Sequence, residues 1–131
     1  MIIKMNNLKN TLYTYFKGLE AGNTAMILEV FTENAMVHSP LYGDQLASVF
    51  YSKLFADTRQ SDITLLNVFK STENESSAAV HFKYHWVLKD GTPTHFECVD
   101  VFKFDETGKV AEMTIIYDTA KLRAAFDNIS L

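Results

Sequence analysis

The sequence is poor in cysteine and carries no strong excess of one charge. Its single cysteine, Cys98, excludes an internal disulfide and any zinc site built from several thiolates. The net charge of −4 comes from mixed signs with no basic stripe, which argues against nucleic acid as a partner. No apolar run approaches the length that spans a membrane. The N-terminal stretch also lacks the long apolar run of a signal peptide, so we expect a cytoplasmic protein with no membrane partner.

The residues that are abundant are those of a packed core. Hydrophobic residues make up 47% of the 131-residue chain and aromatic residues 13%, so the chain can bury a core and is not expected to be disordered. The sequence contains no internal repeat, low-complexity tract or linker. This length is typical of one domain, and we expect residues 1–131 to form a single domain.

The first half of the sequence has the apolar spacing of helices. Residues 5–20 carry apolar side chains on one helical stripe, and a second helix is expected over about 24–32. A short strand is predicted at 35–39, followed by a loop at 40–44. Asp44 is expected to cap a third helix. The inner stripe of this third helix is predicted to consist of Leu46, Val49, Phe50 and Leu54.

In the second half the apolar period changes from that of a helix to that of a strand. We expect four strands joined by turns, and then a short helix over 119–127. The predicted strands cover residues 62–71, 78–89, 95–104 and 109–118. The resulting order, ααβαββββ, predicts an α+β fold. In this fold a strongly curved antiparallel sheet wraps as a cone around three helices.

One strand, "HFECVDVFKF" at 95–104, places an acid on its core face. Alternation puts Asp100 on the same side as Cys98 and three phenylalanines. A lone buried carboxylate is costly unless it is protonated or well hydrogen-bonded. Inner positions of the neighbouring strands offer no lysine or arginine, so we expect the pKa of Asp100 to be raised.

The two faces of the predicted sheet suggest two kinds of contact. Seven residues are expected to line a pocket inside the cone, namely Phe82, Tyr84, Trp86, Phe96, Cys98, Met113 and Tyr117. The outer face carries more apolar surface than a solvated face normally shows, and we expect a homodimer through it. The outer apolar residues are Val87, Val99, Val101 and Ile116.

Three stretches carry a resemblance to a known superfamily. They are "YFKGLEAGNTAMILEVFTENAMVHSPLYG", "VHFKYH" and "VDVFKFDETGKVAEMTIIY", in this order and at matching spacing. Over roughly residues 8–118 the chain resembles the nuclear-transport-factor-2-like superfamily, and within it the ketosteroid isomerase and SnoaL-like branches. The resemblance implies a cystatin-like, cone-shaped fold and the same dimer through the sheet.

The resemblance also implies a site. In ketosteroid isomerases a tyrosine and a protonated aspartic acid donate hydrogen bonds to the enolate oxygen, and a second aspartate moves the proton. By position, Tyr15 matches the tyrosine and Asp100 matches the acid. The base position falls on Ser39, which departs from the pattern, because a neutral serine cannot abstract a carbon-bound proton without its own base.

The identity of the base therefore stays open at this point. His38 has a suitable intrinsic pKa, but alternation points it away from Ser39 unless a bulge or the Pro40 kink turns it inward. A water held by Ser39 is the other candidate. The expected activity is proton transfer on a small carbonyl compound through an enol, with no metal or organic cofactor implied. The alternative is a non-catalytic protein of this fold that binds an apolar small molecule or only dimerises.

Overall fold

The computed structural model describes residues 5–74 and 76–130, and in this part of the chain it contains four helices and six strands. In chain order they are α1 (Met5–Ala21), α2 (Thr24–Leu28), β1 (Phe31–Ser39), β2 (Gly43–Leu46), α3 (Ala47–Ala56), β3 (Thr58–Lys70), β4 (Ser77–Leu88), β5 (Pro93–Phe104), β6 (Val110–Ile116) and α4 (Arg123–Ile129).

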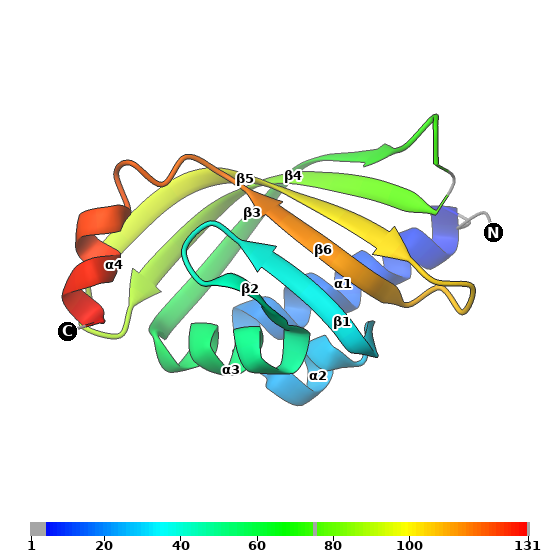
Figure 1. Cartoon of the computed structure of the whole chain (residues 1–131). Helices are drawn as coiled ribbons and strands as arrows, with labels where there is room; N and C mark the ends of the chain where they lie inside the picture. The colour runs from blue at the N-terminus through cyan, green and yellow to red at the C-terminus, as the bar shows by residue number, and fades with distance from the viewer. Residues whose placement is uncertain (1–4, 75, 131) are drawn as a thin grey trace.

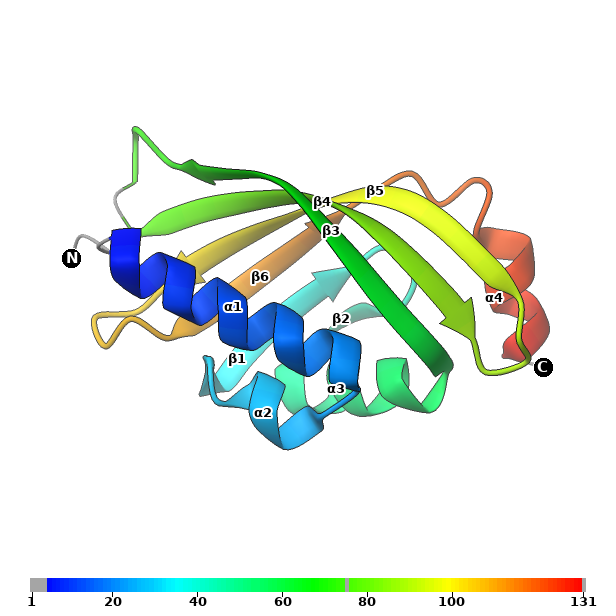
Figure 2. The same ribbon diagram turned by 180° about the vertical axis from the view of Figure 1, so that it is seen from behind.

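The strands form one curved, unclosed sheet in the order β2-β1-β6-β5-β4-β3. The sheet arches over α1, α2 and α3, while α4 lies at one end of the arch beside the β4–β5 turn (Figure 1). The view from behind shows α1 running alongside β3 on the helix side of the sheet (Figure 2). The predicted α+β cone is confirmed, with two corrections to its sheet. The sheet has six strands where five were predicted, because residues 43–46 form β2. The sheet is mixed, because β1 and β6 pair in parallel.

The first two helices follow directly from the sequence pattern. One stripe of α1 is buried, with Leu8, Leu12, Tyr15 and Leu19 at most 4% exposed. The helix ends before Gly22, which has a positive φ of 63° that glycine adopts without steric cost. Asn23 then caps α2, since its side chain accepts a hydrogen bond of 3.0 Å from the Met26 amide.

The segment between α2 and α3 differs most from the prediction. The second helix ends at Leu28, and β1 already begins at Phe31. Residues 43–46, half of which were expected in a loop, form the strand β2, which pairs antiparallel with β1. Gly43 has a φ of 76° and allows the tight return of the chain. Asp44 therefore lies in β2 and does not cap α3, which begins at Ala47.

The buried stripe of α3 also differs from the prediction, because β2 moves the start of this helix to Ala47. Leu46 and Val49, which were predicted to face the core, are 43% and 41% exposed. The buried residues of α3 are Ala47, Phe50, Tyr51 and Leu54, at the spacing i, i+3, i+4 and i+7. Tyr51 thereby enters the core.

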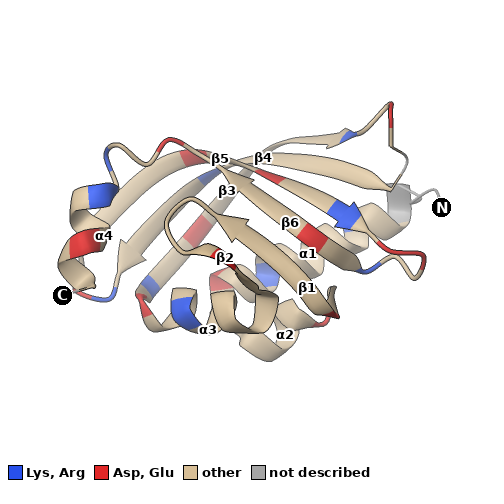
Figure 3. Cartoon of the chain, in the orientation of Figure 1, with Lys and Arg blue, Asp and Glu red and all other residues tan. Residues whose placement is uncertain are grey.

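Charge is distributed evenly over the molecule. Acidic and basic residues are interspersed along the ribbon and do not gather by sign (Figure 3). Among the described residues, Asp100 is the one buried Asp or Glu, at 1% exposure. No helix in the described part of the chain has the length and apolar character needed to cross a membrane.

Candidate functional site

A small, partly open cavity lies inside the cone, between the sheet and two helices. Its volume is about 40 Å³, which is room for a few water molecules. The lining is mostly aromatic and comes from α1, α3, the strands β1, β4, β5 and β6, and the residues that follow β1 and β6. It consists of Tyr15, Leu19, Ser39, Tyr42, Phe50, Leu54, Phe82, Tyr84, Trp86, Phe96, Cys98, Asp100, Ile115 and Tyr117.

Asp100 is the acidic group of this cavity. It lies on β5 opposite Val80 of β4 and Ile115 of β6. One carboxyl oxygen, Oδ2, accepts a hydrogen bond of 3.4 Å from the Tyr15 hydroxyl, and Oδ1 accepts one of 3.3 Å from the Cys98 thiol. Burial raises the pKa of Asp100 to about 7, although these two hydrogen bonds act in the opposite direction. No lysine or arginine among the described residues lines the cavity.

A second tyrosine extends the hydrogen-bonded group. The hydroxyls of Tyr15 and Tyr51 lie 2.8 Å apart, so the chain Tyr51–Tyr15–Asp100 joins α3, α1 and β5. Burial raises the pKa of both tyrosines well above the ordinary value, which keeps both hydroxyls protonated. Sequence reasoning missed Tyr51. The signal that could have found it is its spacing of three residues from Leu54, combined with a helix start at Ala47.

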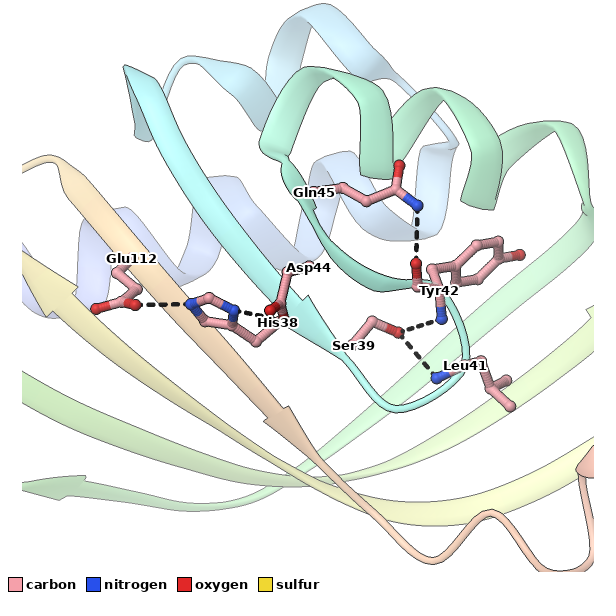
Figure 4. Close-up of polar contacts among 7 residues, drawn as sticks. All are labelled: His38, Ser39, Leu41, Tyr42, Asp44, Gln45 and Glu112. Atoms are coloured by element: carbon pink, nitrogen blue, oxygen red, sulfur yellow. Dashed lines mark hydrogen bonds and ion pairs between the residues drawn. The ribbon is translucent and has the colours of Figure 1, made fainter.

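Ser39 lines the cavity, but its side chain is engaged in the turn that follows β1. The Ser39 Oγ accepts hydrogen bonds from the amides of Leu41 at 3.3 Å and Tyr42 at 3.1 Å (Figure 4). This arrangement joins β1 to β2 and fixes the position of Tyr42. A serine held in this way is a turn residue, and no side chain that could activate it as a base forms a hydrogen bond to its hydroxyl in the described contacts.

His38 lies on the other side of β1, outside the cavity lining. Its ring forms hydrogen bonds with Asp44 at 2.8 Å and with Glu112 at 2.6 Å on the outer face of the sheet (Figure 4). These two carboxylates raise the pKa of His38. The bulge or kink that would have turned the ring inward does not occur at this position, so His38, one of the two candidate bases, faces away from the cavity.

The predicted pocket lining is largely present. Six of the seven predicted residues line the cavity, and Met113 does not. Met113 is completely buried in the core, where its sulfur lies 3.9 Å from the Tyr51 hydroxyl. Hydrogen bonds to residues outside the lining hold two of its tyrosines in place. The Tyr84 hydroxyl pairs with Ser61 at 2.8 Å, and the Tyr42 hydroxyl donates to Asp57 at 2.7 Å.

The described residues contain no group of three or more His, Cys, Asp or Glu side chains that could hold a metal ion. Among the lining residues, the Asp100 carboxyl and the tyrosine hydroxyls are groups that can take part in proton transfer or hydrogen bonding. A carboxyl group with a pKa near neutrality can give or take a proton, and a protonated tyrosine can stabilise negative charge on an oxygen.

An α+β cone with a cavity between a curved sheet and its helices is characteristic of cystatin-like folds. The family model of the SnoaL-like domain matches residues 12–113, and the chain belongs to this family. A search of curated proteins gives no match.

Solved structures share the fold at low sequence identity. SalBIII is described as an epoxide hydrolase/cyclase-like enzyme in pyran ring formation in the polyether salinomycin. It is 20% identical, with a TM-score of 0.72 over 84% of this chain and 89% of that chain. TerC, co-crystallised with polyporic acid, is 14% identical, with a TM-score of 0.75 over 92% and 98%. A protein of unknown function with a cystatin-like fold from Methylobium petroleophilum PM1 is 16% identical, with a TM-score of 0.75 over 89% and 79%.

Proposed function

We propose that the protein binds a small apolar carbonyl compound in the cavity and moves a proton on it through an enol. The reaction would be an isomerisation, cyclisation or dehydration. The observation that supports this proposal is the Asp100 carboxyl, whose pKa is raised to about 7. The other ionisable groups of the lining are four tyrosines and Cys98, whose pKa values are raised by burial. Asp100 is thus the lining group that can exchange a proton at neutral pH.

The proposed steps use Asp100 and Tyr15 in different roles. As a carboxylate, Asp100 takes a proton from the carbon next to the carbonyl. The electron pair of that C–H bond forms the C=C bond of the enolate, and negative charge develops on oxygen. Tyr15 then donates its hydrogen bond to this oxygen in place of the long 3.4 Å bond to Asp100. Asp100 finally returns the proton to another carbon. Asp100 takes the role that the family pattern gives to position 39.

The Tyr51 hydroxyl contributes by holding the Tyr15 hydroxyl in position. At 2.8 Å from the Tyr15 hydroxyl, it keeps Tyr15 oriented when Tyr15 donates toward a substrate. The apolar lining disfavours charge at other positions in the cavity. It also strengthens the interaction of these donors with a developing oxyanion. The volume of about 40 Å³ requires lining side chains to move before a ring-sized substrate enters.

The test is proton exchange and isomerisation of small ketones, including a β,γ-unsaturated ketone, followed by NMR in D₂O and by ultraviolet absorbance. We expect kcat/KM to rise with pH through about 7 and then level off, as Asp100 loses its proton. Asp100→Asn should lower the rate by about 10²- to 10⁴-fold. Tyr15→Phe should lower it by about 10²-fold. His38→Gln, outside the cavity, is the matched control and should leave the rate unchanged.

The alternative function is binding without catalysis, which the engaged hydroxyl of Ser39 favours, because the cavity then has no second acid–base group. A phenol that binds with the same affinity at pH 5 and pH 9, together with undetectable exchange on every ketone tested, would support this alternative and contradict the proposed reaction. Loss of phenol binding in Tyr15→Phe would still place the ligand in the cavity.

A further inference from the structure

A second hollow lies outside the cone, between α1 and the edge strand β3. It is an open groove of about 560 Å³, much larger than the internal cavity and within the range of small-molecule sites. α1 and β3 run alongside each other in Figure 2, on the helix side of the sheet. The groove is lined by Lys9, Leu12, Tyr13, Phe16, Lys17, Glu20, Ile63, Leu65 and Val68.

The floor of the groove is apolar and incompletely covered. Leu12 and Phe16 of α1 face Ile63, Leu65 and Val68 of β3 across it. Leu65 is 52% exposed, which is unusual for a leucine on the inner side of a sheet. From Lys9 to Glu20 the α1 wall is about 16 Å long, at roughly 1.5 Å per helical residue. This length suits an extended alkyl chain better than a compact ring system.

The α1 wall carries a positively charged rim. Lys9, Tyr13 and Lys17 lie at i, i+4 and i+8, so all three are on one side of the helix. The Lys17 ammonium donates a hydrogen bond of 3.0 Å to the Tyr13 oxygen, which leaves the Tyr13 hydroxyl hydrogen available to a ligand. The acid in the groove, Glu20, already accepts a hydrogen bond of 3.0 Å from the Ile63 amide.

The edge of β3 is less suited to pairing with another strand. Glu20 occupies the edge-facing amide of Ile63, and the ladder to β4 is interrupted between Leu65 and Asn67. Blocked amides and bulges are the means by which edge strands avoid pairing with further strands. A strand from a second copy or from a partner would find the Ile63 amide already occupied and would form fewer backbone hydrogen bonds to β3. A small amphiphile needs no backbone hydrogen bonds.

We propose that this groove binds a free long-chain carboxylate, with the alkyl chain on the floor and the carboxylate at Lys9, Tyr13 and Lys17. This site is separate from the cavity and does not depend on the reaction proposed there. The charge of the rim complements an anionic head, and the apolar floor complements the chain.

The experiment is titration of the full chain with sodium dodecanoate below its micelle concentration, by calorimetry and by amide NMR shifts. We expect saturable binding with shifts at residues of α1 and β3. Leu65→Ser should weaken binding by about five- to tenfold, because it removes apolar contact. Lys17→Glu should weaken it by about fivefold or more. Dodecanol, which lacks the charge, should bind the wild type several-fold more weakly than dodecanoate does.

Two exposed positions on α3 provide the controls. Val49→Ser removes an apolar side chain of similar exposure, and Lys53→Glu reverses an exposed lysine, so both should leave dodecanoate binding unchanged. Shifts confined to Tyr84 and Asp100 would place the chain in the cavity and overturn the proposal. Dissociation of a dimer by Leu65→Ser would show that a second copy occupies the groove. Binding to phosphatidylglycerol vesicles without saturable binding of dodecanoate would show that the groove contacts a membrane surface, and it would overturn the proposal of a free carboxylate.

Discussion

The interior of the cone and the outer face of its sheet each hold a group with a raised pKa, for different physical reasons. Asp100, at 1% exposure, has a raised pKa because burial removes the water that stabilises its charged form. His38, on the outer face, has a raised pKa because Asp44 and Glu112 stabilise its charged form. Rising pH therefore creates an unfavourable charge inside and removes a favourable charge outside.

This comparison shows that the same direction of pKa shift has different consequences for an acid and for a base. Near pH 7 the interior group is poised to exchange a proton, while the outer histidine is mainly part of a hydrogen-bonded array that ties β2 to β6. Interior changes should have large, pH-dependent effects, and changes on the outer face smaller ones.

The largest expected effect is on stability, from removal of the buried acid. A carboxyl whose pKa rises from 3.8 to about 7 on folding makes the folded state less stable as pH rises from about 4 to about 7. Asp100→Asn removes this dependence, which amounts to at most about 4 kcal/mol at ~1.4 kcal/mol per pKa unit. Urea unfolding from pH 4 to pH 8 measures it. If the free energy of unfolding changes with pH in the same way for wild type and for Asp100→Asn, Asp100 is not desolvated in the folded protein.

The control for that experiment is an acid in a surface turn whose pKa shifts in the opposite direction. Hydrogen bonds from Thr107 and neighbouring amides lower the pKa of Asp105, which lies in the β5–β6 turn. The stabilisation that the Asp105 carboxylate provides is present above the pKa of this side chain in the unfolded chain. It is lost as pH falls through the lower pKa that the side chain has in the folded protein. Asp105→Asn should therefore be destabilised at pH 7 relative to wild type and approach wild type below pH 3.

The next effect concerns the position where the family pattern has a base. Ser39→Asp would place a second carboxylate in the cavity, which raises the pKa of Asp100 further. In this variant Asp100 therefore stays protonated and acts as a donor, while the new carboxylate at position 39 takes over its role as base. We expect turnover of a β,γ-unsaturated ketone to rise by about 10²-fold. Asp100→Ala in that background should remove most of the gain.

Ser39→Asn is the matched control for this prediction. Asparagine can accept the same hydrogen bonds from the Leu41 and Tyr42 amides, but it cannot act as a base. Equal rates for Ser39→Asp and Ser39→Asn would contradict the prediction, because they would show that residue 39 does not reach the reacting carbon.

A smaller effect is expected from the outer face as a dimer interface, which we retain as a proposal. Val99 and Val101 point outward and are half-buried, and Ile116, opposite Val99 on β6, is 53% exposed. Val101→Lys should raise the dimer dissociation constant by about tenfold or more. Val49→Lys on α3 should not. Sedimentation velocity measures both, and a wild type that stays at 14.9 kDa at micromolar concentration would rule the interface out.

The smallest effect should come from His38. The stability that its array provides is fully present below the pKa of the unfolded histidine and is lost as pH rises through the raised folded value. His38→Gln should therefore destabilise the protein at pH 6 and much less at pH 9. Because Asp44 is 72% exposed and Glu112 39%, the loss at pH 6 should stay below about 1 kcal/mol and shrink with added salt. An equal loss at both pH values would indicate packing as its cause.

Much of the cone could be predicted because its signals are local. The side-chain period of a strand is two residues, so the sequence of β5 places Asp100 on the core face whatever strands lie beside it. The same argument places Phe82, Tyr84 and Trp86 on the inner face of β4. The stripe of α1 orients Tyr15 inward in the same way.

Other features could not be predicted, because they depend on residues far apart in the chain. The parallel pairing of β1 with β6 brings Glu112 to His38, and this contact spans 74 residues. The return of the chain at Gly43 forms β2, shifts the start of α3 and turns Tyr51 toward Tyr15. Neither event has a local periodic signal.

The sequence by itself therefore determined the α+β class, the helices and strands that carry clear periodicity, and the inward direction of Tyr15 and Asp100. The tertiary structure alone decided that these two side chains meet at 3.4 Å, that Ser39 is held in a turn, and that His38 faces outward between two carboxylates. It also decided that a groove stays open beside α1. The physical reason is that periodicity selects the face of an element, whereas distances between elements follow from how they pair and pack.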